Sequence, residues 1–150
     1  MKVIAGNKKA YHDYFIDETL EAGIVLAGPE VKSIRVNGLS LRESFAHVRG
    51  GECWLNGVHI KPYTQGSYNN LDPDRPRKLL LHRRQIRYLD EKTRQKGLSL
   101  VPTKVYFSDD NRVKVEIGIA RGKKNYDKRA TIAARDAQRD IQRAFKSRNL

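Results

Sequence analysis

The sequence predicts a mainly β protein, built as a small closed antiparallel barrel of about six strands with two to three accessory helices. Residues 113–119 alternate between aliphatic side chains and Lys, Glu or Gly, which is typical of a half-buried antiparallel strand. Strand-like runs also flank two turn segments, residues 49–51 and 108–111, as expected for hairpins. A sheet of about six antiparallel strands is more easily closed into a barrel than left open, because closure removes the exposed strand edges.

The first half of the chain is predicted to contain a long strand, a short helix and a hairpin. Residues 10–28 are rich in aromatic and β-branched side chains, and Gly23 would supply a bend or a close backbone approach. Residues 28–38 are predicted to form a short helix, because Pro29 stands at a helix-starting position and a glycine ends the segment. The runs on either side of residues 49–51 would form the hairpin.

The second half begins with a long polar loop over residues 61–77, which is rich in turn-forming residues. A helix is predicted from about residue 82 to residue 96, because a glycine follows as a helix stop. Residues 78–81 would be extended, and a second hairpin would occupy residues 98–120. This order of elements predicts an OB-like barrel with the helix between its third and fourth strands.

The charge of the chain is large and unevenly distributed. The formal net charge is +13 and the isoelectric point is near 10.0. Residues 121–150 carry +7, although they are one fifth of the chain, and residues 1–120 carry +6. Such an excess predicts a polyanionic partner, either nucleic acid or an acidic membrane surface. We therefore expect two parts, a barrel over residues 1–120 and a basic C-terminal tail over residues 121–150.

The tail is expected to be disordered when free and to fold into a helix when bound. Its apolar stripe is mostly alanine, which buries little, and a short isolated helix is marginal in water. Arg135, Arg139 and Arg143 lie four residues apart, so like charges would stack on one helix face. A polyanionic partner would remove this repulsion and make the arginines into phosphate contacts.

No residue pattern predicts catalysis, a metal site or a cofactor. The four histidines are scattered without metal-ligand spacing, and the motifs of nucleotide-binding loops are absent from the sequence. Cys53 is the single cysteine, so it is expected to be a small buried hydrophobe, as in a reducing cytosol. No segment approaches the length of a signal peptide or a membrane span. We expect a cytoplasmic protein that is not an enzyme and has no membrane partner.

Nucleic-acid binding is the function that the residues favour. Basic and aromatic side chains are interleaved over residues 61–63, 104–106 and 123–126. Lys and Arg neutralise phosphates, and aromatic rings stack on unpaired bases. Tyr106 is equally compatible with a place in the core and with a contact to RNA, because it lies in an alternating strand. Tyr126 lies outside any core pattern, which favours a contact.

Several longer stretches resemble one family. The matching stretches read "NKKAYHDYFIDETLEAGIVLAGPEVKSIR", "WLNGVHIKPY", "DPDRPRKLLLHRRQI", "KGLSLVPTKVYF", "VKVEIGIARGKK" and "YDKR". They cover most of residues 7–129 and occur in the family's order. On these motifs the chain resembles the small protein B family, the bacterial partners of transfer-messenger RNA.

The resemblance implies a fold and a function. It implies an OB-like barrel of six strands that binds the tRNA-like domain of transfer-messenger RNA and delivers it to stalled ribosomes for trans-translation. The tail would enter the decoding centre and the empty mRNA channel of the small ribosomal subunit as a helix. Elongation factor Tu and alanyl-tRNA synthetase would be indirect partners, because they act on the same RNA. The alternatives are a general OB-type RNA-binding or ribosomal protein without this specificity, and an RNA-processing enzyme, which would need a catalytic cluster.

The resemblance also implies two sets of functional residues. The RNA-facing set comprises Asn7, Lys8, Lys9, Glu21, Lys32, Arg77, Lys78 and Leu80. The ribosome-facing set in the tail comprises Gly122, Lys123, Lys124, Tyr126, Asp127, Lys128 and Arg129. At Tyr126 the family has an aromatic residue or a histidine, which is suited to stacking. Pro29 is a departure, because the family more usually has Thr or Ser there.

Overall fold

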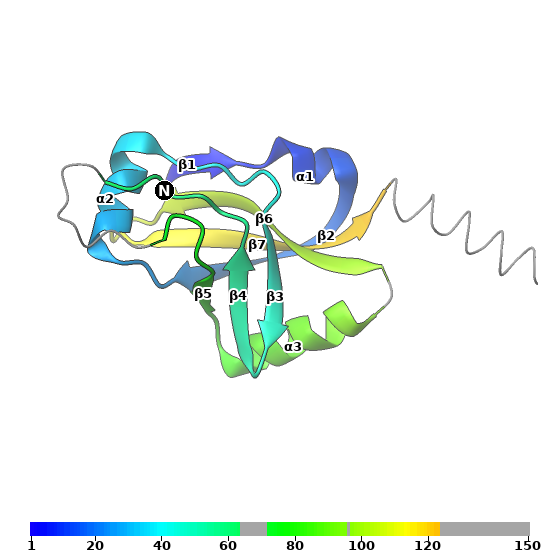
Figure 1. Ribbon diagram of the computed structural model, residues 1–150. Coiled ribbons are helices and arrows are strands. Elements are labelled where there is room, and N and C mark those ends of the chain that lie inside the picture. Colours follow the sequence, from blue (N-terminus) through cyan, green and yellow to red (C-terminus); the bar gives the residue numbers. More distant parts are fainter. Residues whose placement is uncertain (64–71, 96, 124–150) are drawn as a thin grey trace, which may run out of the picture.

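The computed structural model describes residues 1–63, 72–95 and 97–123. Seven strands and three helices occur within these residues. In chain order they are β1 (Lys2–Gly6), α1 (Lys8–Asp13), β2 (Tyr14–Ile24), α2 (Gly28–Asn37), β3 (Phe45–Arg49), β4 (Glu52–Asn56), β5 (Arg77–Leu80), α3 (Arg83–Arg94), β6 (Leu98–Phe107) and β7 (Val113–Gly122) (Figure 1). The predicted behaviour of the tail beyond residue 123 lies outside the described residues.

The described strands form one antiparallel sheet that closes on itself. Their order is β1-β6-β3-β4-β5-β2-β7, and an additional pairing between β6 and β7 closes a ring of six strands. The seventh strand, β1, adds to the edge of β6. The predicted small closed barrel is therefore confirmed. The predicted helix after the polar loop is α3, but it lies between the fifth and sixth strands. Lys2–Gly6 is an additional strand, and the segment that was predicted to be extended at residues 78–81 forms a strand of its own, β5.

The N-terminal region differs from the predicted long strand, because residues 8–13 form α1. Asn7 caps this helix: its side-chain oxygen accepts a hydrogen bond from the Ala10 N–H at 3.2 Å. Its side-chain amide donates to the carbonyl of Pro102 on β6 at 2.7 Å. One asparagine thus begins the helix and joins it to the barrel, and the predicted strand begins only at Tyr14.

Glycines stand where the backbone requires them. Gly50 and Gly51 join β3 to β4 with φ of 60° and 77°, a region that other residues rarely adopt. Gly23 on β2 lies opposite Leu80 on β5, and a Cβ at Gly23 would be 3.2 Å from the Leu80 Cβ. The predicted hairpin and the predicted close approach at Gly23 are confirmed.

The core fills the inside of the ring. The apolar residues of β7 between Val113 and Ile119 are buried, which confirms the predicted alternation. Cys53 on β4 is fully buried, as predicted. Leu89 is fully buried on the side of α3 that faces the core. These side chains belong to one cluster that spans the strands of the barrel and both α2 and α3.

A charged network is buried at the side of this core. Glu30 of α2 accepts hydrogen bonds from Arg77 Nη2 at 2.7 Å and from Arg75 Nη2 at 2.5 Å. Arg77 is fully buried and also donates to the carbonyl of Val58 at 2.5 Å. Burial raises the pKa of Glu30, but the hydrogen bonds from Arg75, the Ala27 N–H and Arg77 outweigh it and lower the pKa below its ordinary value. The network fastens α2 to β5.

Replacing Glu30 by Gln should lower the free energy of unfolding by about 3–5 kcal/mol, because the Arg77 guanidinium would remain buried without a counter-charge. Glu52→Gln is the matched control. Glu52 is paired with Lys78 at the surface, 2.7 Å away, so this substitution should lower the free energy of unfolding by less than about 1 kcal/mol. Urea unfolding of both variants and the wild type measures the difference.

The effect of Glu30→Gln should depend on pH. Because the folded-state pKa of Glu30 is lowered, its stabilisation is present above the ordinary pKa of 4.5 and is lost as pH falls through the folded-state value. The difference in the free energy of unfolding between the variant and the wild type should therefore become smaller below pH 4.5. If this difference stayed constant as the pH falls below 4.5, the destabilisation could not be due to loss of the Glu30 charge.

Candidate nucleic-acid interface

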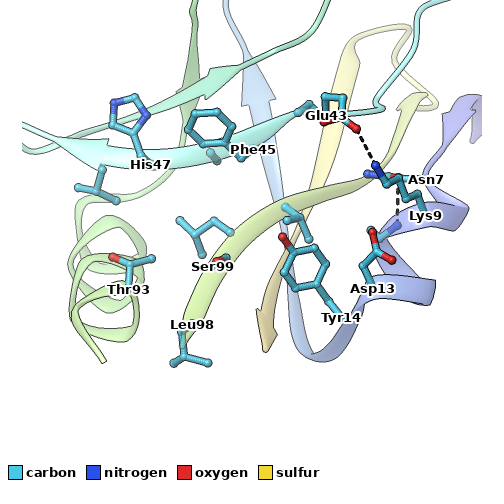
Figure 2. A pocket seen from close by; sticks show the side chains of 16 residues that line it. Asn7, Lys9, Asp13, Tyr14, Glu43, Phe45, His47, Thr93, Leu98 and Ser99 are labelled. Atoms are coloured by element: carbon cyan, nitrogen blue, oxygen red, sulfur yellow. Dashed lines mark hydrogen bonds and ion pairs between the residues drawn. The ribbon is translucent and has the colours of Figure 1, made fainter. Parts of the chain in front are cut away.

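A groove opens between α1, α3, β3 and β6 (Figure 2). It has a volume of about 500 Å³. The groove exists because β3 and β6 are joined by one pair of residues, Ala46 and Leu100, while β1 pairs with β6 over residues 104–107. The two strands therefore diverge toward Leu98, and side chains rather than backbone pairs fill the space between them.

The walls of the groove are aromatic and polar. The Phe45 ring from β3 is half exposed and lies 6.3 Å from the ring of His47. Tyr14 projects from the start of β2 with its hydroxyl toward the middle of the groove, across from Phe45, and Ser99 contributes a hydroxyl from β6 (Figure 2). The His47 Nδ1 atom is 2.7 Å from the side-chain amide of Asn56.

Lys9 and Glu43 close one end of the groove with an ion pair of 2.6 Å (Figure 2). The hydrogen bond between them raises the pKa of Lys9 and lowers the pKa of Glu43. Lys8, the first residue of α1, is exposed. Three residues of the predicted RNA-facing set, Asn7, Lys8 and Lys9, thus stand at this end of α1.

A second group of predicted residues lies on β2 and β5. Leu80 is half exposed across from Gly23, and Lys78 is paired with Glu52. The Glu21 carboxylate is exposed and accepts a hydrogen bond from the hydroxyl of Tyr106. Lys32 is exposed on α2, a separate element.

Arg77 has a different environment from the one expected, and Tyr106 has one of the two environments that the sequence left open. Arg77 is fully buried in the network with Glu30, so its side chain is not available to an RNA in this structure. Tyr106, which the sequence left open between core and contact, is buried, and burial together with the Glu21 hydrogen bond raises its pKa. Arg77 and Tyr106 therefore support the surface on which Lys78 and Glu21 stand.

The start of the tail is held against the barrel. β7 continues through Gly122, which pairs with Tyr14, so residue 121 is still within a strand. The Lys123 N–H donates to the Asp13 carbonyl at 2.7 Å, and its side chain donates to the Tyr11 carbonyl at 3.1 Å. The rest of the ribosome-facing set, residues 124–129, lies outside the described residues.

Sequence reasoning missed two aromatic side chains near this region. Phe15 is exposed on β2, with Arg121 and Lys123 5.2 and 5.0 Å from its ring centre. Phe45 begins β3 and forms a wall of the groove. Both rings belong to runs that had been assigned as strands, where alternation alone does not reveal which large apolar residue faces outward.

The described residues also bear on whether the chain has a metal site, a membrane span or a reactive thiol. Among residues 1–63, 72–95 and 97–123, no cluster of three or more His, Cys, Asp or Glu could hold a metal ion. No helix in the same ranges is long and apolar enough to cross a membrane. Burial raises the pKa of the Cys53 thiol to about 11.

Cys53 should therefore react slowly with a thiol reagent. Between its ordinary pKa of 9.0 and the value of about 11 in the folded protein, the thiolate fraction at pH 8 falls about a hundredfold, and burial blocks access further. Labelling of the native chain with a disulfide reagent should be at least that much slower than labelling in urea. Equal rates in the two conditions would show that β4 opens readily.

Comparison with known proteins agrees with the fold and with the sequence motifs. The SmpB protein family matches residues 4–147. The SsrA-binding protein of Syntrophotalea carbinolica is 55% identical over 149 residues, which are 99% of each chain. That of Carboxydothermus hydrogenoformans is 56% identical over 147 residues, 98% of each chain.

A solved structure described as "tmRNA-SmpB: a journey to the center of the bacterial ribosome" is also similar. It has a TM-score of 0.68 and 50% identity, and the match covers 82% of this chain and 85% of the other. Near-complete coverage at this level of identity is far above chance, and so the chain belongs to the SmpB protein family.

Proposed function

We propose that this chain binds the tRNA-like domain of transfer-messenger RNA through its barrel and delivers the RNA to stalled ribosomes for trans-translation. The relatives are named SsrA-binding proteins, and the description of the solved relative pairs it with tmRNA and the bacterial ribosome. The tail, residues 124–150 in particular, would enter the decoding centre and the empty mRNA channel of the small subunit. The chain would act in the cytoplasm by binding, without a catalytic step of its own.

The observation that carries this proposal is the junction between α1 and the tail. The backbone of Lys123 is hydrogen-bonded to Asp13, the last residue of α1, whose first residues are Lys8 and Lys9. A partner RNA on α1 and a ribosome on the tail would therefore meet at the same end of the molecule. The charges are consistent with two polyanionic partners, because residues 1–120 carry +6 and residues 121–150 carry +7.

The RNA-facing surface would combine positioning and specificity. Lys8, Lys9 and Lys32 would contact phosphates, which fix the register of the RNA. Glu21 and Leu80 carry no positive charge, so they would contact bases or riboses. Elongation factor Tu and alanyl-tRNA synthetase would bind the same RNA and meet this protein only through it.

Binding of the full chain to the tRNA-like domain should weaken with salt. For about four to six phosphate contacts, log K plotted against log salt should have a slope of about −3 to −5. Lys8→Ala should make the slope less steep by about 0.7 to 0.9, because one phosphate contact is lost. Filter binding at several salt concentrations measures this.

Arg112→Ala is the control for the salt experiment, since it removes one positive charge from the β6–β7 turn, where the guanidinium is 3.4 Å from Asp110. Its slope should equal that of the wild type. The same change of slope in both variants would mean that the attraction is diffuse and that α1 is not the phosphate-binding element. An equal affinity for an unrelated transfer RNA would favour the general RNA-binding alternative.

Truncation after Lys123 should separate the two proposed activities. It leaves β7 and the contacts of Lys123 intact, so the chain should fold and bind the RNA within about tenfold of full length. It should nevertheless fail to support tagging of a peptide on a stalled ribosome in a reconstituted assay. A full-length variant with Asp127, Lys128 and Arg129 replaced by Ala should reproduce much of that failure. Normal tagging by the truncated chain would refute the role of the tail.

A further inference from the structure

We propose that the groove beside α1 binds one unpaired base of the RNA, stacked on the ring of Phe45. This inference rests on the proposed function and assigns a recognition mode to one part of its surface. The groove volume of about 500 Å³ lies in the range of pockets that enclose small ligands, so it suits a single nucleotide rather than a duplex.

The first argument is the position of Phe45. It begins β3, and half of its surface is exposed, whereas its neighbour Ala46 is buried and pairs with Leu100. Within the described part of the chain its ring neighbour is His47, at 6.3 Å and tilted by 38°, so the two rings are not face-to-face stacked. A large ring left half uncovered in a groove is suited to a flat aromatic ligand, and a nucleobase is one.

The second argument is the set of polar groups around the ring. The hydroxyls of Tyr14 and Ser99 line the groove and have no hydrogen-bond partner within the described part of the chain. The Nδ1 atom of His47 is occupied by Asn56, which leaves its Nε2 atom for a ligand. Such groups can donate and accept, as recognition of the edge of a base requires.

The third argument is the distribution of charge, which favours a neutral base over a phosphate inside the groove. Asp13 lines the groove and lies near Lys9, whose pKa it helps to raise (Figure 2), and its carboxylate is 2.9 Å from His12 Nδ1. Glu43, at the same end, is paired with Lys9, so two carboxylates lie near that lysine and oppose a phosphate inside the groove. A neutral base over Phe45 meets no such repulsion, and its phosphate would lie outside the groove, where exposed lysines such as Lys8 would contact it.

The test compares Phe45→Ala, Phe45→Leu and Phe45→Tyr in the full chain by filter binding to the tRNA-like domain of transfer-messenger RNA. Loss of one stacked base is expected to weaken binding by about 5- to 150-fold in the Ala variant. The Leu variant should lose nearly as much, because it retains apolar surface without a ring face. The Tyr variant should bind within about twofold of the wild type.

Tyr88→Ala is the control, because Tyr88 is an exposed aromatic residue on α3 that does not line the groove. It should bind the RNA within about twofold of the wild type. The salt slope gives a second readout: Phe45→Ala should lower affinity at every salt concentration without changing the slope, since stacking releases no counterion.

The outcomes separate this inference from the proposed function. If the wild type fails to bind the RNA, the proposed function itself is wrong, and this inference falls with it. If the wild type binds and Phe45→Ala binds equally well, only the base-binding groove is overturned, which leaves the groove to another occupant such as an extended peptide. Equal losses in Phe45→Ala and Tyr88→Ala, or full retention in Phe45→Leu, would also overturn it.

Discussion

The strand β6 lies against three others, and much of the molecule follows from how its edges are shared. One edge pairs with β7 along its length, while the other is divided between β1 over residues 104–107 and β3 at Leu100. Neither β1 nor β3 can take the whole edge, so a gap remains between them. Asn7 spans part of it by donating to Pro102 and capping α1. The closed barrel thus produces both the groove and the helix that carries Lys8 and Lys9.

The opposite side of the barrel depends on charge that is not exposed. β5 is four residues long, and its first residue, Arg77, is fully buried. A strand this short pairs with β2 over two positions and with β4 over three, so backbone pairing alone holds it weakly. The Glu30–Arg77 ion pair adds the connection to α2. The same network therefore determines where Lys78 and Leu80 stand.

Much of this fold was predictable from local patterns, and the exceptions have identifiable causes. Alternation in β7 and glycines in the β3–β4 turn are local signals, and both elements were predicted. The helix α1 has six residues, too few for a clear period, and its one signal was the capping asparagine. The burial of Arg77 depends on Glu30, 47 residues away, which no local pattern reveals.

The candidate site was less predictable than the fold for the same reason. Family resemblance pointed to α1 as an RNA-facing element, and that element is exposed beside a groove. Phe45 was not singled out, because its strand contains apolar residues on both faces and only the divergence of β3 from β6 leaves its ring uncovered. Resemblance also grouped Arg77 with Lys78, although adjacent residues in a strand point to opposite sides.

The distribution of ion pairs suggests how the two parts of the chain divide the work of binding. Cations of the barrel such as Lys9 and Lys78 already have carboxylate partners, so a phosphate must compete with an acid that is in place. Such competition reduces attraction to any polyanion and favours an RNA whose shape offers further contacts. Residues 121–150 have ten basic residues and three acidic ones, which leaves most of their cations without an acid of their own in that segment. On the proposed function, the barrel is therefore the part suited to selecting an RNA, and the tail is the part suited to strong, sequence-independent attraction to a polyanion.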